Sequence, residues 1–156
     1  MLTLADIFEA LTNVRPDTSQ VITEATVDSR QAIPGALFVA IPGERVDGHD
    51  FIEAAFQKGA VAALVQHEVK PELRVVDVRQ GLHAEALVDL ANIEEPFCLW
   101  VENSLEALQK IAHFWRRKLD VRVVGITGSV GKSTTKELVA EVLGQRYRTL
   151  KNPGSL

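Results

Sequence analysis

The sequence contains a single cysteine, Cys98, among its 156 residues. One cysteine cannot form an internal disulfide, and its surroundings lack the cysteine and histidine spacing of a metal cluster. We therefore expect Cys98 to be a small buried side chain on a strand. The absence of a disulfide framework favours a reducing compartment such as the cytoplasm.

Excess positive charge and long apolar runs are also absent. The formal net charge is −4, and the basic residues do not gather strongly enough to follow a nucleic-acid backbone. No apolar run approaches the ~20 residues that span a bilayer. The N-terminus carries Asp6 and Glu9 and lacks the basic start of a signal peptide. These absences predict a soluble cytoplasmic protein without a nucleic-acid partner or a membrane span.

The apolar pattern predicts alternating strands and helices. One short helix is expected from residue 4, with Thr3 and Asp6 as a capping pair, and another from residue 51, capped by Asp50. Longer helices are expected from Ser104 and Lys132, and residues 81–95 suggest a helix or an irregular segment. Strands are expected at residues 20–30, 36–41, 60–65, 74–78, 97–103, 121–126 and 147–152.

The helix expected from Ser104 carries the clearest apolar stripe. Its last turn holds Arg116, Arg117 and Lys118, and cations there complement the negative end of the helix dipole. We interpret this triplet as a solvated helix end and not as a nucleic-acid site. The expected apolar face consists of Leu105, Leu108, Ile111, Ala112 and Trp115.

Strands that alternate with helices indicate the α/β class. We place a domain boundary near residues 102–104, which gives a small first domain over residues 1–103 and a second over residues 104–156. The second domain would start with a parallel βαβ unit that consists of strand 121–126, a glycine loop, a helix and strand 147–152. The side chains of that helix expected to face inward are Leu138, Val139, Val142 and Leu143.

The stretch GITGSVGKSTTKE, residues 125–137, has the chemistry of a phosphate-binding loop. It departs from the standard G-x-x-x-x-G-K-[ST] pattern, because Ile126 stands where the first glycine belongs. Glycines allow a tight turn that aims backbone N–H groups at phosphate oxygens, and the following helix adds its positive end. The structural alternative is a glycine turn in which Ser133 caps the helix and Lys132 is solvated.

The polar residues of this loop have predicted roles in binding ATP with Mg²⁺. Lys132 would neutralise charge on the β- and γ-phosphates, and Ser133 would place its hydroxyl on Mg²⁺. The predicted ATP-binding residues are Gly128, Ser129, Val130, Gly131, Lys132, Ser133 and Thr134, with Lys132 as the catalytic residue.

These residues resemble the ATP loop of the Mur ligases, the ATP-dependent amide-bond ligases of peptidoglycan synthesis. VVGITGSVGKSTTKE is similar to that loop, and its TTKE tail favours the members that add D-alanyl-D-alanine. VDSRQAIPGALFVAIPGERVDGHDFIEAAFQKGAVAALV resembles the N-terminal domain of the ligases that add meso-diaminopimelate, lysine or D-alanyl-D-alanine. The resemblance covers essentially the whole chain, with a looser match over residues 66–96.

The resemblance implies that the first domain holds the UDP part of a UDP-N-acetylmuramoyl-tripeptide. Ser29 and Arg30 would contact the uridine diphosphate, and His49 would contact the uracil or its ribose. Two structural alternatives stay open: a local ion pair between Asp28 and Arg30, and a DGHD loop that only caps the helix at Asp50.

The resemblance also implies a reaction in two steps. ATP phosphorylates the carboxylate of the UDP-linked peptide, and the amine of D-alanyl-D-alanine then attacks the acyl phosphate. Family members continue beyond the segment similar to KNPGSL, so we expect this chain to be the N-terminal part of a longer ligase and inactive alone. Because a partial sheet leaves an open edge and apolar surface, we also expect self-association or disorder beyond about residue 144.

Three alternatives stay open at this point. A related Mur ligase that adds meso-diaminopimelate or lysine has a similar first domain. A stand-alone module for UDP-sugar-peptides would bind UDP without binding Mg-ATP. An unrelated P-loop kinase or ATPase would need the standard glycine, where this chain has Ile126.

Overall fold

The computed structural model describes residues 1–81 and 95–152, so most of the segment predicted at 81–95 lies outside the described residues. The chain divides into two compact units, Met1–Leu119 and Asp120–Leu156. Within the described residues, no helix combines the length and the apolar character that crossing a membrane requires.

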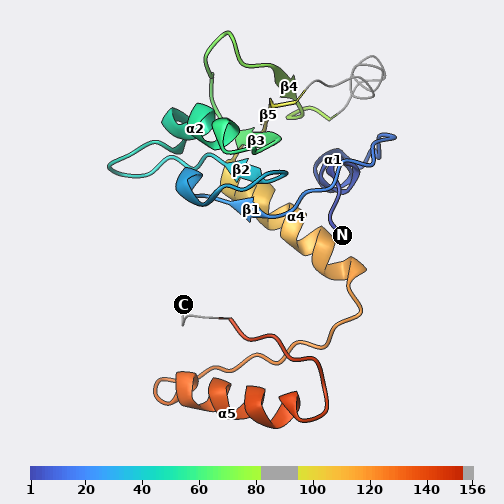
Figure 1. Cartoon of the computed structure of the whole chain (residues 1–156), viewed down its shortest axis with the longest axis vertical. Helices are drawn as coiled ribbons and strands as arrows, with labels where there is room; N and C mark the ends of the chain where they lie inside the picture. The colour runs from blue at the N-terminus through green and yellow to red at the C-terminus, as the bar shows by residue number, and fades with distance from the viewer. Residues whose placement is uncertain (82–94, 153–156) are drawn as a thin grey trace. The chain divides into compact units, whose positions relative to one another are not determined.

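The first unit is built on a five-stranded sheet in which every pairing is parallel, with strand order β1-β2-β3-β5-β4 (Figure 1). The strand predictions in this unit are confirmed, although each strand is shorter than its apolar run. The strands are β1 (Ala25–Thr26), β2 (Leu37–Val39), β3 (Ala62–Val65), β4 (Val75–Asp77) and β5 (Phe97–Trp100).

Helices cover both faces of this sheet, which explains the continuous apolar runs of its central strands. α1 (Leu4–Thr12) and α4 (Ser104–Lys118) contribute to one apolar cluster, and α2 (Ile52–Gln57) contributes to the other. Neighbouring strand residues alternate between the clusters: Leu37 lies in the first and Phe38 in the second. The sheet is therefore the middle layer of three.

Cys98 lies in the second cluster with none of its surface exposed. Burial raises the pKa of its thiol to about 12. The prediction of a buried structural cysteine on a strand is confirmed, because a thiol with so high a pKa holds its proton at neutral pH.

The capping pair predicted at the start of α1 is present and extends into an ion-pair cluster. The Thr3 N–H donates to Asp6 Oδ2 at 2.9 Å, while the Asp6 N–H donates to Thr3 Oγ1. The other carboxylate oxygen of Asp6 accepts from Arg15 at 2.7 Å and from Lys118 at 2.8 Å. Lys118 ends α4, so it links the two helices and is more than the solvated helix end that we predicted.

The predicted cap at Asp50 is wrong. A 3₁₀ turn, Gly48–Phe51, comes before α2, and Asp47 caps that turn by accepting from the His49 N–H at 2.9 Å. α2 itself begins without a side-chain cap. The physical reason is that the 3₁₀ turn already directs the chain into the helix, so the capping side chain stands three residues earlier.

The predicted apolar stripe of α4 is only partly right. Its buried residues are Ser104, Ala107 and Ile111, whereas Leu105 is 45% exposed. Small side chains at 104 and 107 let the helix approach the sheet, so the buried face is rotated from the one that the larger residues indicated. The helix is capped by Asn103, which accepts from the Glu106 N–H.

The first compact unit ends at Leu119, directly after α4, whereas the predicted domain boundary lies before this helix, near residues 102–104. Ala107 and Ile111 belong to the apolar cluster of the first unit, and Lys118 pairs with Asp6. α4 is therefore structurally part of the first unit.

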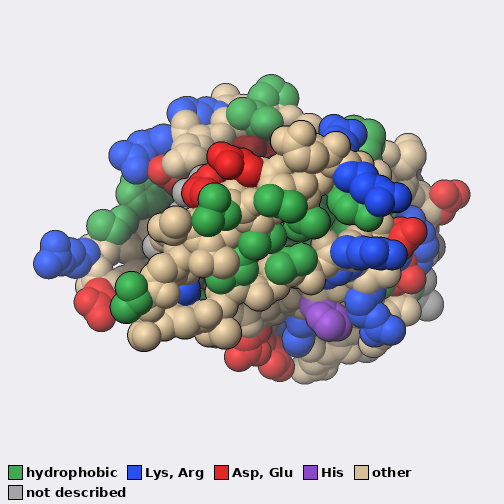
Figure 2. Space-filling view, turned by 90° about the horizontal axis from the view of Figure 1, so that it is seen from below, with side chains coloured by type: hydrophobic (Ala, Val, Ile, Leu, Met, Phe, Trp, Pro, Cys, Tyr) green, Lys and Arg blue, Asp and Glu red, His purple; other side chains and the backbone are tan. Residues whose placement is uncertain are grey.

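In the second unit, α5 (Lys132–Gly144) is confirmed, but the strands predicted at 121–126 and 147–152 are not formed. A strand needs a ladder partner, and no pairing occurs among the described residues of this unit. Leu138 and Val142 were predicted to face inward and are 58% and 71% exposed. Figure 2 shows hydrophobic side chains on the face seen from below; whether they drive self-association stays a prediction.

We predict that Asp6→Asn destabilises the chain by about 2 kcal/mol, because it removes the charge that Arg15 and Lys118 share. Burial opposes ionisation of Asp6, but hydrogen bonds from Arg15, Lys118 and Thr3 outweigh it and lower the carboxyl pKa. Its contribution to stability is therefore present above the ordinary pKa of 3.8 and is lost as the pH falls below it.

Urea unfolding of both proteins from neutral to acid pH measures this difference. The control Asp17→Asn changes an exposed carboxylate and should behave like the wild type. Equal stability of Asp6→Asn and the control at neutral pH would contradict the prediction.

Candidate functional site

The loops that follow β1, β2 and β3 emerge from the same edge of the sheet, because the three strands are parallel neighbours. In open α/β sheets, ligands bind outside the carboxyl ends of the strands. Ser29 and Arg30 follow β1, His49 follows β2, and Gln66 and His67 follow β3. We call the described residues of these loops the substrate edge.

The Asp28-Ser29-Arg30 motif forms a 3₁₀ turn, Ser29–Gln31, capped by Asp28. Arg30 donates from Nε and Nη2 to the two Asp28 oxygens at 2.9 Å each. The Arg30 guanidinium and backbone N–H lower the pKa of Asp28 to about 2. The local ion pair considered from the sequence is thus confirmed, while the Arg30 side chain stays 86% exposed and Ser29 only 8% exposed.

The Asp47-Gly48-His49 motif places an imidazole inside the edge. The His49 side chain is only 5% exposed, and its Nδ1 lies 2.6 Å from Asp47 Oδ1. Its Nε2 accepts from the Gln66 N–H at 3.0 Å. Both ring nitrogens of His49 therefore have hydrogen-bond partners within the protein. This geometry favours a structural role for His49, and its predicted contact with uracil or ribose stays a prediction.

Sequence reasoning missed His67, which stacks on His49 with ring centroids 3.6 Å apart and an angle of 28° between the rings. Its Nε2 lies 2.9 Å from Asp47 Oδ2. The position of His67 in the sequence could have indicated this contact. His67 comes two residues after the end of β3, and β3 pairs with β2, the strand that leads to His49.

The ligand atoms of Asp47, His49 and His67 lie within 4.8 Å of one another, close enough for a metal ion. The hydrogen bonds of His49 do not fit a metal site. Because its Nε2 accepts from a backbone N–H, its Nδ1 must carry the ring proton, and that proton occupies the position a metal would take. We interpret the cluster as a hydrogen-bonded support.

Gln66 connects this support to α4. The Gln66 N–H donates to His49, and the Gln66 side-chain oxygen accepts from the Ser104 N–H at 2.9 Å. Ser104 is fully buried at the first turn of α4. The start of α4 is thus held by the same loop residue that holds His49.

The predicted phosphate loop lies in the second unit, where α5 begins at Lys132. Gly128 has φ +150° and Gly131 has φ +79°, a left-handed conformation that glycine adopts without strain. Gly131 is the N-cap, and no side chain caps the helix, so the alternative in which Ser133 caps it is wrong. In the described part of the chain, the N-cap therefore supplies no side-chain acceptor to the first-turn N–H groups, an arrangement that suits anion binding.

Lys132 extends back along this loop, and its Nζ donates to the Gly128 carbonyl at 2.6 Å. Val130, at the tip of the loop, is 90% exposed. The loop is therefore accessible to a ligand, with one cation beside its backbone. The parallel sheet places the first unit in the α/β class, and a glycine loop at a helix N-terminus is a feature that nucleotide-binding α/β proteins share.

Comparison with known proteins identifies the family. The profile described as "Mur ligase family, catalytic domain" matches residues 21–116. The chain belongs to the Mur ligase family, as the loop and the first unit predicted.

Several relatives are UDP-N-acetylmuramoyl-tripeptide–D-alanyl-D-alanine ligases. The one from Treponema pallidum is 38% identical over 83% of this chain and 26% of its own length. The one from Escherichia coli is 32% identical over 99% of this chain and 29% of its own length. A solved MurF ligase from Thermotoga maritima, in complex with ADP, superposes with a TM-score of 0.66 at 28% identity, over 89% of this chain and 27% of that chain.

This chain spans about a quarter of the length of these relatives. Family membership also means that the alternative of an unrelated P-loop kinase or ATPase is wrong.

We predict that Gly48→Ala distorts the Asp47-Gly48-His49 turn and destabilises the first unit by about 1–3 kcal/mol, the usual cost of overpacking. A Cβ at this position would lie 2.6 Å from Ile41 N and 2.9 Å from Ile41 O, and backbone atoms cannot move aside cheaply.

Urea unfolding measures the effect, with Gly144→Ala as the control, because a Cβ at Gly144 meets nothing within 4 Å. The prediction fails if both variants unfold at the same urea concentration as the wild type.

Proposed function

We propose that this chain is part of an ATP-dependent ligase that joins D-alanyl-D-alanine to UDP-N-acetylmuramoyl-tripeptide in peptidoglycan synthesis. One observation carries the proposal: α5 begins without a side-chain cap, directly after a loop that contains two glycines with positive φ. Lys132 lies beside that loop and donates to the Gly128 carbonyl. That loop occurs in a chain similar to ligases named for this reaction. Both nucleotide substrates are cytoplasmic metabolites, so we propose a cytoplasmic location.

In this proposal the second unit holds Mg-ATP, the residues Gly128 to Thr134 forming the site. The backbone N–H groups at the start of α5 would contact phosphate oxygens, and Lys132 would leave the Gly128 carbonyl to neutralise developing charge. Ser133 would place its hydroxyl on Mg²⁺, which neutralises charge on the phosphates. ADP in the Thermotoga maritima relative supports nucleotide binding.

The substrate edge of the first unit would hold the UDP part of the other substrate. The exposed guanidinium of Arg30 can pair with the diphosphate, and two of its nitrogens are already oriented by Asp28. Ser29 would add a hydrogen bond beside it. His49 and Gln66 would support this edge from within.

We predict that Lys132→Ala weakens Mg-ATP binding by the purified chain at least about tenfold, the effect of losing a charge-assisted phosphate contact. Isothermal titration calorimetry measures it, with Lys136→Ala as a control that removes a cation from the same helix. If the two variants bind Mg-ATP equally well, Lys132 has no special part in the site. Binding of UDP without any binding of Mg-ATP by the wild type would favour the stand-alone module.

The reaction itself is tested by release of ADP from the longer protein that contains this chain. We expect release to require UDP-N-acetylmuramoyl-tripeptide and D-alanyl-D-alanine together, and we expect no turnover by the 156-residue chain alone.

A second candidate is supported by a diaminopimelate ligase from Bacillus licheniformis, which is 32% identical over 78% of this chain and 20% of its own length. A requirement for meso-diaminopimelate or lysine in place of the dipeptide would establish that candidate and overturn the first.

A further inference from the structure

The two stacked histidines of the substrate edge differ in their hydrogen-bond partners. His67 has an acceptor at each ring nitrogen, whereas His49 has one acceptor and one donor. His67 Nδ1 lies 3.0 Å from the Glu68 carbonyl oxygen, and its Nε2 lies 2.9 Å from Asp47 Oδ2. A carbonyl and an ionised carboxylate can only accept hydrogen bonds. Only the imidazolium form carries a proton on both nitrogens, so the geometry around His67 selects the charged ring.

The partners of His49 select the neutral ring. Its Nε2 must accept, since the Gln66 N–H can only donate, and its Nδ1 donates to Asp47 Oδ1. The side chain is almost fully buried. Burial lowers the pKa of His49 and outweighs the Asp47 carboxylate, which acts in the opposite direction.

Asp47 is the shared partner of both rings. One of its oxygens accepts from the His49 backbone N–H and ring, and the other accepts from His67. The Glu68 carbonyl and the Asp47 carboxylate raise the pKa of His67 with help from the charge of Asp50. The charged groups that act on His67 are thus Asp47 and Asp50, and Glu68 contributes its backbone carbonyl. His67 in turn helps to lower the pKa of His49, on which it stacks.

We propose that His67, as an imidazolium ion, is a positioning residue that holds the Asp47 carboxylate in place and so fixes the Asp47-Gly48-His49 turn. The phosphate loop has no part in this role of His67. The part of the proposal that concerns ligand affinity rests on the proposed function, because it assumes that the turn borders the UDP site. The part that concerns the protonation states stands on the geometry alone.

The two rings give the turn an optimum pH. His67 has a raised pKa, so its contribution is fully present below the ordinary histidine value of 6.5 and is lost as the pH rises through its raised pKa. His49 has a lowered pKa, so its contribution is present above 6.5 and is lost as the pH falls towards its lowered pKa. Together they stabilise the turn most near 6.5.

The first test is an NMR titration of the whole chain labelled with ¹⁵N, from pH of about 5.5 to about 8.5, which spans the ordinary histidine range. We expect His49 to show the neutral Nδ1–H tautomer near neutral pH and His67 to deprotonate above pH 6.5. The His49 and Gln66 amide signals should shift together with His67. The proposal is overturned if His67 deprotonates at or below the ordinary value, or if those amides do not respond.

The second test measures binding of UDP-N-acetylglucosamine over the same pH range, because the charge of its diphosphate stays constant there. Wild-type affinity should fall several-fold as His67 loses its proton. His67→Arg keeps a permanent cation with donors for both acceptors, so its affinity should not depend on pH. His67→Gln should bind weakly at every pH, as should Arg30→Ala, which removes a proposed ligand contact.

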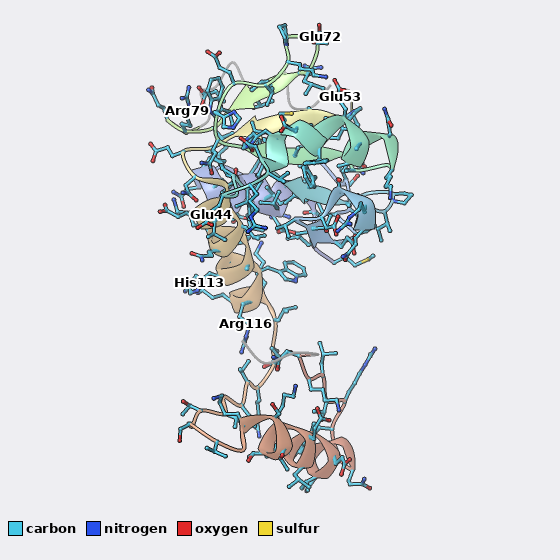
Figure 3. The ribbon with its side chains drawn as sticks, turned by 90° about the vertical axis from the view of Figure 1, so that its left-hand side faces the viewer. Glu44, Glu53, Glu72, Arg79, His113 and Arg116 are labelled. Carbon is cyan, nitrogen blue, oxygen red and sulfur yellow. The ribbon has the colours of Figure 1, made fainter. Side chains whose placement is uncertain are left out.

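His113→Gln is the matched control, since His113 projects from α4 (Figure 3) and has none of these contacts. It should follow the wild-type pH profile. If every variant binds equally at all pH values, His67 does not position the site. If no protein binds the probe while the NMR titration behaves as expected, the UDP site is wrong and the positioning of the turn by His67 stands.

Discussion

Parallel pairing of β3 with β2 and β5 is the constraint on which the first unit depends. Parallel strands need crossover connections, and these place helices on both faces of the sheet. That requirement explains why the residues of β3 are all buried and why α2 lies opposite α1 and α4. The same pairing sends the chain out of the same edge after every strand. The site is therefore a consequence of strand direction before any particular side chain is considered.

Two carboxylates, those of Asp6 and Asp47, connect segments that lie outside the strand pairing of the sheet. Asp6 accepts hydrogen bonds from Thr3, Arg15 and Lys118, and Asp47 accepts them from His49 and His67. Each carboxylate satisfies local backbone donors and also contacts a residue distant in sequence. Because a carboxylate offers about four acceptor positions, it can join segments that apolar packing would hold only approximately. Removing either charge is therefore expected to release more than one contact.

The sequence was most informative where local rules and burial agree. The capping pair of Thr3 and Asp6, the buried strands and α5 could all be predicted, because each follows from short spacing or a continuous apolar run. Predictions were wrong where tertiary context decides. The residues of 121–126 have strand propensity but no ladder partner among the described residues, and Leu105 was placed inside although Ala107 faces the sheet. The His49–His67 stack needs three-dimensional neighbours, which spacing alone does not supply.

α4 shows how the substrate edge can influence the segment that follows the first unit. Its first turn is held by the Gln66 side chain, and its last residue, Lys118, is held by Asp6 and Glu9. The Gln66 N–H also supports His49, so a shift of that ring on ligand binding would act directly on the start of α4. The chain leaves α4 at Leu119 and reaches the phosphate loop nine residues later, at Gly128. α4 therefore connects the hydrogen bonds of the substrate edge to the covalent link that leads to the proposed phosphate loop.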